Sequence, residues 1–176
     1  MWRWVTRRLN GCMNPSVAVG FLLCLVGCGE SAPPCSDESR FIAAVSAGCL
    51  VQSQAGTLLV RDWRGKLALP GGSVARDESA HCGAEREVFE EAGLTVVAGQ
   101  LATVFDNGFH LFRCHADPDA APRILRPAEI KEVGWWRPER VTDAEWRYPG
   151  QGAVITELLA VETATTNPPE TQSINQ

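Results

Sequence analysis

The chain has 176 residues, of which 45% are hydrophobic and 21% are charged, and its formal net charge is −5. This length fits one domain with a substantial hydrophobic core. The 21 acidic residues outnumber the 16 basic ones, and this acidic balance argues against nucleic acid as the natural partner.

The first 27 residues are typical of a secretory signal. Arg3, Arg7 and Arg8 form a basic opening, and an apolar run over residues 17–26 follows it. That run is too short for a transmembrane helix, which needs about 20 apolar residues, but it has the proportions of a signal peptide. We therefore expect residues 1–27 to be removed, which leaves thirteen basic and 21 acidic residues and a net charge of −8.

The signal ends in Leu25-Val26-Gly27-Cys28, which resembles the bacterial lipobox, where the cysteine is lipidated and becomes the new N-terminus. The resemblance implies a lipid anchor on Cys28, with an uncleaved membrane anchor as the alternative. Because Gly29 rather than Asp follows, it also implies export to the cell envelope, on the periplasmic side of a Gram-negative outer membrane. Residues 28–40, which contain prolines and serines, are expected to form a tether.

Three strands are predicted ahead of an acidic helix. Residues 43–51 and 57–62 have strand composition and are separated by a turn near Ala55-Gly56. Residues 67–69 form a third, short apolar strand. Pro70-Gly71-Gly72 ends it, because proline lacks the amide hydrogen and glycine permits positive φ.

The next segment is predicted to be a helix that begins after an N-cap at Ser79 and ends at a left-handed C-cap, Gly93. Glu87, Glu90 and Glu91 share one face of it, and like charges at this spacing cost about 0.2–0.5 kcal/mol per pair. A divalent cation would remove that repulsion, and oxygen-only ligands favour Mg²⁺ or Mn²⁺ over zinc. A solvated acidic helix face is the alternative interpretation.

The helix belongs to a segment that reads Gly72-x5-Glu78-x7-Arg86-Glu87-Val88-x-Glu90-Glu91-x-Gly93-Leu94. This segment is similar, without departure, to the signature of the Nudix hydrolases, and a looser likeness in strand order extends over residues 41–161. The resemblance implies an enzyme that uses Mg²⁺ or Mn²⁺ to hydrolyse the diphosphate linkage of a nucleoside diphosphate derivative.

The resemblance also implies roles for particular residues. The metal ligands would be the side chains of Glu87, Glu90 and Glu91 together with the carbonyl of Gly71. Arg86 would orient the acids through a salt bridge and would belong to the catalytic set with Glu90 and Glu91. The residues that support the loop and the helix would be Gly72, Glu78 and Gly93.

The general base is expected to be a glutamate, either within the motif or in a later loop, as in the family that the chain resembles. Glu129 is the preferred residue of the later loop and Glu132 the second choice, because both lie just before an apolar strand around Trp135-Trp136. Exposed charges at a strand edge are the alternative interpretation of both.

The remaining elements complete a small α/β domain over residues 41–162. A strand region is expected over 94–105 with a bend or bulge at Gly99. The other expected elements are an Asp106-Asn107-Gly108 hairpin into a strand over 109–114, an irregular loop over 116–127 and a helix over 153–161. Strands interleaved with two helices favour a sheet between helices, and the family resemblance implies this same architecture, a Nudix-type α/β/α sandwich with a mixed sheet. Residues 163–176 are polar and are expected to be disordered.

Four cysteines remain after Cys12 and Cys24 in the signal and the lipidated Cys28 are set aside. They are Cys35, Cys49, Cys82 and Cys114, an even number that fits two disulfides in an oxidising compartment. Three connectivities are open, and the strand positions of Cys49 and Cys114 favour that pair, with Cys35–Cys82 as the other. The alternatives are buried free thiols and a zinc site built from His81-Cys82 and Cys114-His115.

The expected partner is a small molecule linked to a nucleoside diphosphate, and its identity and the oligomeric state are not indicated by the sequence. A nucleobase could stack on an aromatic residue, but aromatic residues at strand spacing are more often core. The candidates are Phe105, Phe109, Phe112, Trp135, Trp136 and Trp146. Loop arginines such as Arg126 could hold phosphates. A non-catalytic nucleotide-binding or interaction module with the same fold is the second functional hypothesis.

Overall fold

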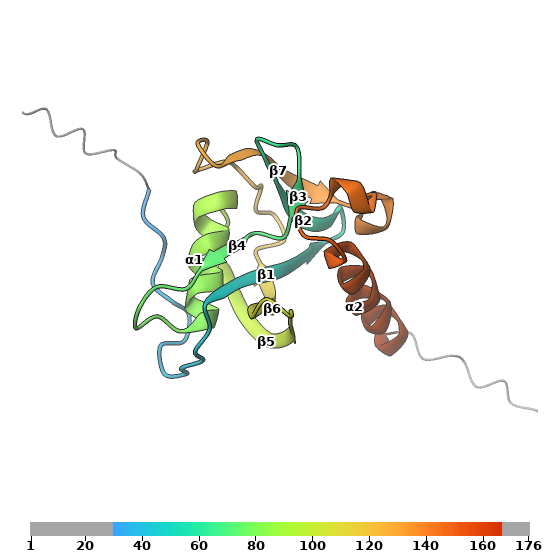
Figure 1. Cartoon of the computed structure of the whole chain (residues 1–176). Helices are drawn as coiled ribbons and strands as arrows, with labels where there is room; N and C mark the ends of the chain where they lie inside the picture. The colour runs from blue at the N-terminus through green and yellow to red at the C-terminus, as the bar shows by residue number, and fades with distance from the viewer. Residues whose placement is uncertain (1–29, 167–176) are drawn as a thin grey trace, which may run out of the picture.

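The computed structural model describes residues 30–166, apart from the side chains of Ala144 and of residues 162–166. Its strands are β1 (Ser46–Ser53), β2 (Gly56–Asp62), β3 (Leu67–Ala68), β4 (Gly71–Ser73), β5 (Val96–Val104), β6 (Phe109–Ala116) and β7 (Ile130–Trp136). Its helices are α1 (Ala80–Ala92) and α2 (Gln151–Thr166), with short 3₁₀ turns at Pro138–Arg140 and Asp143–Glu145. Figure 1 shows the arrangement.

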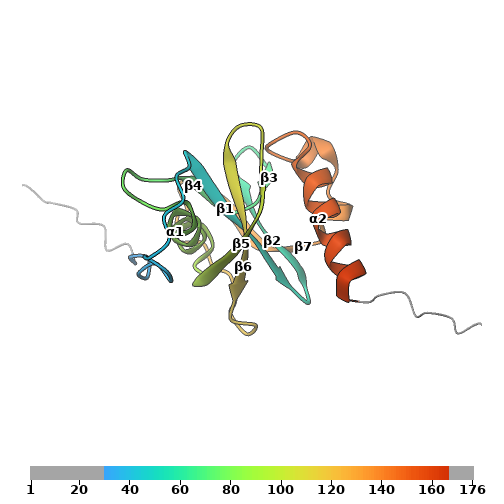
Figure 2. The same ribbon diagram turned by 90° about the horizontal axis from the view of Figure 1, so that it is seen from below.

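The sheet is mixed, as the sequence predicted. Its main path runs β3-β2-β1-β6-β5, with β4 paired to β1 and β7 paired to β2. The β1–β6 pairing is parallel and the other pairings are antiparallel. Helices α1 and α2 lie on opposite sides of the sheet (Figure 2), so the predicted α/β/α sandwich is confirmed.

Two apolar clusters fill the space on either side of the sheet. Leu58 of β2 packs in the cluster under α1, whereas its neighbour Leu59 packs in the cluster under α2. Trp135 and Trp136 of β7 divide between the two clusters in the same way. Successive side chains of a strand point to opposite faces, so each of these apolar pairs contributes one residue to each cluster.

Both disulfides have the pairing that the sequence favoured. Cys49 and Cys114 join the parallel strands β1 and β6 inside the core, and Cys35 joins Cys82 of α1. A zinc site needs free thiolates at Cys82 and Cys114, and the alternative of buried free thiols needs four unbonded cysteines. Neither fits a structure in which all four sulfurs are bonded in pairs.

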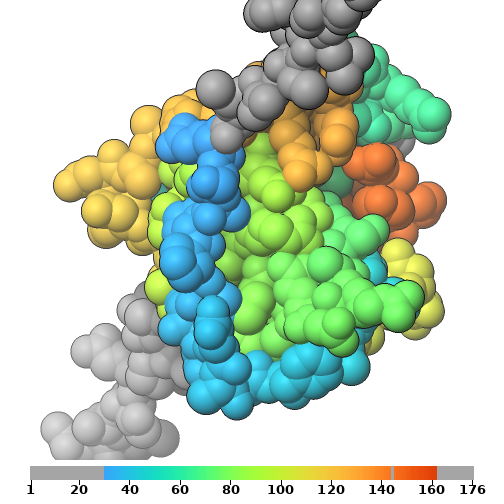
Figure 3. All heavy atoms as spheres, turned by 90° about the vertical axis from the view of Figure 1, so that its left-hand side faces the viewer, coloured from blue at the N-terminus to red at the C-terminus, as the bar shows by residue number. Residues whose placement is uncertain are grey.

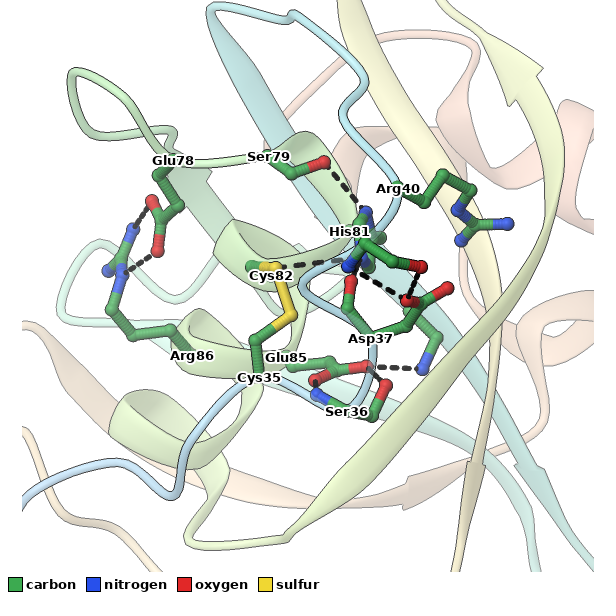
Figure 4. The surroundings of a disulfide bond; sticks show 12 residues. Cys35, Ser36, Asp37, Arg40, Glu78, Ser79, His81, Cys82, Glu85 and Arg86 are labelled. Atoms are coloured by element: carbon green, nitrogen blue, oxygen red, sulfur yellow. Dashed lines mark hydrogen bonds and ion pairs between the residues drawn. A yellow bond between two sulfur atoms is a disulfide. The ribbon is translucent and has the colours of Figure 1, made fainter.

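The segment before the first strand is attached to α1 rather than extending freely from the domain. Besides the disulfide at Cys35, the N–H and hydroxyl of Ser36 donate to Glu85 at 2.9 and 2.5 Å, and the carbonyl of Asp37 lies 2.7 Å from His81 Nε2. Figure 4 shows these contacts, and Figure 3 shows the segment lying over the outer face of the helix. Residues 35–37 are therefore packed against α1, whereas the sequence indicated a tether over residues 28–40.

Two local details differ from the sequence prediction, although the N-cap position itself is confirmed. Ser79 stands at the N-cap position of α1, but its hydroxyl makes no capping bond; it accepts the N–H of Ile42 at 2.9 Å and contacts His81. Helix α2 continues to Thr166, whereas the sequence indicated disorder from residue 163. The first proline after 163 is Pro168, and proline disfavours helix only from the residue before it.

The signal segment and Cys28 lie outside the described residues. Within residues 30–166, no helix combines the length and the apolar character needed to cross a bilayer.

Candidate functional site

The Gly-Gly turn places backbone directly against the acidic helix. A Cβ at Gly72 would lie 2.6 Å from the carboxyl carbon of Glu87, and a Cβ at Gly71 would lie 2.6 Å from the Ala47 carbonyl oxygen of β1. Neither space admits a side chain. Glycine at both positions therefore lets β4 contact β1 on one side and the carboxylates of α1 on the other.

The three acids of the motif project from one face of α1, as their spacing predicted. Glu87 and Glu91 are buried, with 8% and 6% of their surface exposed, and Glu90 is partly buried. The N–H of Gly71 donates to Glu91 Oε2 at 2.9 Å. The helix ends at Gly93 with φ 63° and ψ 19°, which is the expected left-handed C-cap.

Arg86 holds the acidic cluster together. Its guanidinium makes two hydrogen bonds to the carboxylate of Glu78, at 2.9 and 3.0 Å, and one to Glu87 at 2.8 Å. The nitrogen that contacts Glu87 also reaches Glu90 at 3.2 Å, and the other terminal nitrogen donates to the carbonyl of Ser73 at 2.8 Å. One planar cation thus fixes the loop, the start of the helix and two motif acids relative to one another.

Glu78 connects this network to the loop before the helix. The guanidinium of Arg86 holds the pKa of the Glu78 carboxyl below its ordinary value. Glu78 Oε2 also accepts the N–H of Ala75 at 2.8 Å. The turn that this bond closes contains Asp77, which adopts a left-handed φ of 65°. Glu78 therefore stabilises a strained turn as well as the arginine.

Arg126 is a second cation at the cluster. Its guanidinium makes a very close contact with the same Glu90 oxygen that Arg86 reaches, and it lies 3.6 Å from Glu129. Sequence reasoning considered Arg126 only as a phosphate-binding candidate. The structure places it against the motif acids, because the loop after β6 returns over the end of α1, where the Arg123 N–H donates to the Ala92 carbonyl at 2.8 Å.

The electrostatics of the cluster favour a bound cation. Burial raises the pKa of the Glu91 carboxyl to about 8, and the negative charge of Glu87 adds to the rise. Burial also raises the pKa of Glu87, against the lowering effect of Arg86. Two buried carboxylates that repel each other are costly to ionise without compensating charge. A hard divalent cation supplies that charge, and the available donors are all oxygen, so the residues fit Mg²⁺ or Mn²⁺.

Glu91 lines two cavities. One, called here the β4 cavity, has a volume of ≈ 180 Å³ and includes Gly71, Gly72 and Ser73 in its lining. The other, called here the β7 cavity, has a volume of ≈ 300 Å³ and includes Glu129. Arg147 also lines both cavities, so the two cavities share one acid and one arginine.

The two base candidates are placed differently. Glu129 shares the β7 cavity with Glu91. Glu132 lies on β7 and pairs with Arg61 of β2 at 2.9 Å. Glu129 is therefore the candidate of the two that lies near the motif acids.

The β4 cavity also contains residues that sequence reasoning did not single out. They are Asn107, Arg147, Tyr148 and Gln151. A parallel bridge between Leu67 and Trp146, and the 2.8 Å hydrogen bond from Arg147 N–H to the Leu67 carbonyl, bring this segment to the sheet. The sequence feature that could have indicated these residues is the Trp146-Arg147-Tyr148 run before a helix. Only its pairing with Leu67 shows that this run lies beside the β4 cavity.

The aromatic candidates separate into two groups. Phe105 and Phe109 line the β4 cavity, with their rings 6.0 Å apart in an edge-to-face arrangement. Phe112 and Trp146 are buried in the core, and Trp135 and Trp136 pack against its two clusters.

Comparisons with known proteins agree with this geometry. Residues 43–158 match the family model described as the NUDIX domain. A MutT-like protein of Streptomyces ambofaciens is 31% identical in an alignment of 107 residues that covers 57% of this chain and 68% of that protein.

Solved structures with the same fold include an ADP-ribose pyrophosphatase from Streptococcus suis, with a TM-score of 0.58 at 20% identity, covering 69% of this chain and 92% of that one. A UDP-X diphosphatase has a TM-score of 0.56 at 17% identity over 72% and 68% of the two chains. An Ap4A hydrolase of C. elegans has a TM-score of 0.55 at 16% identity over 68% and 98%. These likenesses show the fold, and together with the matched family model they establish that the chain belongs to the NUDIX domain family.

Proposed function

We propose that this protein is a Mg²⁺- or Mn²⁺-dependent hydrolase that cleaves the diphosphate linkage of a nucleoside diphosphate derivative. The observation that carries the proposal is that Glu87 and Glu90 share the guanidinium of Arg86, while Glu91, on the same face of α1, accepts the Gly71 N–H and lines two cavities. The names of the structural neighbours, which refer to ADP-ribose, UDP-X and Ap4A, support the substrate class.

Each part of the site has a defined task in this reaction. A cation bound by the three acids would polarise the phosphoryl oxygens and lower the pKa of an attacking water. Arg86 keeps Glu87 and Glu90 in position before substrate arrives. Arg147, which lines both cavities, would offer a positive charge to a diphosphate, and Glu129, which lines the β7 cavity, would accept a proton from water.

The decisive experiment is a hydrolysis assay on a panel of nucleoside diphosphate derivatives, with and without Mg²⁺, that measures released nucleoside monophosphate or phosphate. We expect cation-dependent turnover of at least one compound and its loss in Glu90→Gln, with an unchanged circular dichroism spectrum. Glu139→Gln, at an exposed glutamate outside the cluster, is the matched control. If Glu90→Gln turned over substrate at the parent rate, the metal site would be wrong, and binding of nucleotides without turnover would favour the non-catalytic module.

We also propose that the domain acts after export, attached to a membrane through lipid on Cys28. Two disulfides in one small domain support an oxidising compartment, and the lipobox-like sequence supports the anchor. Intact-mass measurement of the membrane-extracted protein tests this proposal. An unprocessed N-terminus, or an unmodified Cys28, would refute it.

A further inference from the structure

Gln151 is a buried polar side chain whose amide oxygen is left unpaired. Only 5% of its surface is exposed, and its Oε1 has no hydrogen-bond partner among the described residues. Leaving a buried acceptor unsatisfied costs about 1–3 kcal/mol, so a natural protein rarely carries one without a purpose. Gln151 lines the β4 cavity, where a bound molecule would meet it.

The fold offers no internal reason for this amide. Gln151 begins α2, and its backbone N–H already donates to the Tyr148 carbonyl at 3.2 Å. Trp146 Nε1 is also unpaired, but that ring packs against Gly152, where a Cβ would lie 2.3 Å from the nitrogen. Of these two unpaired groups, Gln151 is the one that lines the β4 cavity.

The walls of the β4 cavity are suited to a flat aromatic group. Phe109 is fixed tightly against the backbone, because its ring tip lies 2.5 Å from where a Cβ of Gly48 would be and 2.9 Å from that of Gly71. Phe105 meets it edge to face, and the half-exposed Tyr148 lines the same cavity. Aromatic walls beside polar side chains such as Gln151 are the surroundings in which proteins hold nucleobases, by stacking and by hydrogen bonds to base edges.

The size and position of the cavity fit one part of a nucleotide. At ≈ 180 Å³ it is smaller than the roughly 300–1,000 Å³ of sites that enclose a whole drug-sized ligand. It shares Glu91 and Arg147 with the ≈ 300 Å³ β7 cavity. A base in the β4 cavity would therefore place the diphosphate beside Glu91 and Arg147 and the attached group towards the β7 cavity.

We propose that Gln151 is a specificity-determining residue that binds the hydrogen-bonding edge of the substrate's nucleobase in the β4 cavity, with Oε1 accepting a base N–H. This inference rests on the proposed function for the identity of the reacting group. Beyond that function, it assigns the nucleobase end of the substrate to the β4 cavity and identifies Gln151 as the side chain that binds the base.

The test compares Gln151→Met, which keeps the side-chain length and removes the amide, with the parent protein. The substrates are ADP-, GDP-, CDP- and UDP-linked forms of one sugar, together with the best of these methylated on the base nitrogen that carries the N–H. We expect Gln151→Met to lower kcat/KM for the preferred base by about ten-fold, mainly through KM, and to reduce the differences among the four bases. Methylation of the base should lower kcat/KM of the parent protein by a similar factor and should change kcat/KM of the variant little.

Gln54→Leu is the control variant, since Gln54 is exposed and lines a different cavity. Ratios among the four bases that stay within about two-fold of the parent ratios in Gln151→Met would overturn the inference. If Gln151→Met fails to give a cooperative melting transition, Gln151→Asn, which withdraws the amide by one methylene, replaces it with the same expectation.

Binding separates this inference from the proposed function. Calorimetry with the four nucleoside monophosphates requires no turnover, and we expect the base preference to appear in the parent and to weaken in Gln151→Met. A protein that binds with this preference but hydrolyses nothing would refute the proposed function alone. A protein that hydrolyses the panel with no dependence on Gln151 would refute this inference alone.

Discussion

Replacing Glu91 by Gln should stabilise the cation-free protein at neutral and alkaline pH and should remove most of its stabilisation by Mg²⁺. Burial raises the pKa of Glu91 from its ordinary value of 4.5 to about 8. The folded protein therefore holds this proton more tightly than the unfolded chain does. The stabilisation that the protonated Glu91 gives to the folded state is fully present below about pH 4.5 and is lost as the pH rises through about 8. The shift corresponds to roughly 3–5 kcal/mol of unfolding free energy.

Glutamine removes this dependence because it is neutral at every pH and retains an oxygen for the Gly71 N–H. The assay is urea unfolding of metal-chelated protein from about pH 5 to about pH 9, repeated with Mg²⁺ for the parent, for Glu91→Gln and for the exposed Glu139→Gln. We expect a flatter stability curve and a smaller Mg²⁺ effect for Glu91→Gln alone. Parallel curves for parent and variant would show that Glu91 titrates normally and would refute the reasoning.

Three further changes have definite expected outcomes. Arg86→Lys should lower kcat by at least about ten-fold in steady-state kinetics, because an ammonium group cannot reproduce the two bonds to Glu78 together with those to the motif acids; an unchanged kcat would contradict the orienting role. Arg126→Met should tighten Mg²⁺ binding measured by calorimetry, since it removes a cation that competes at Glu90, and weaker binding would contradict that competition. Cys35→Ser should lower the unfolding free energy by about 4 kcal/mol in urea, the loop-entropy value for a sequence separation of 47, and no change would mean that the segment is not held by its disulfide.

The acidic helix could be predicted in detail because its information is local. The spacing of Glu87, Glu90 and Glu91 fixes their common face, and Gly93 ends the helix where a left-handed residue is required. The alternation of Trp135 and Trp136 between two apolar clusters was predictable for the same reason. Periodicity determines these features before any tertiary contact forms.

The rest of the site depends on contacts between distant segments. Arg147 and Gln151 reach the β4 cavity because Trp146 bridges to Leu67, about eighty residues earlier in the chain, and no local pattern specifies that bridge. The hydroxyl of Ser79 had the correct position for a cap, but the N–H of Ile42, from a distant segment, binds it instead. Tertiary partners therefore decided the role of these side chains.

The attachment of the N-terminal segment to α1 has a consequence for how the protein can be immobilised. Cys82 and Glu91 are nine residues apart, which is two and a half turns of an α-helix, so they point in opposite directions from its axis. Figure 4 shows the disulfide and the Ser36–Glu85 contacts away from the Glu78–Arg86 pair. A force applied through a bead, a fusion partner or a lipid surface coupled ahead of Cys35 would reach α1 through Cys82, on the side of the helix opposite Glu91.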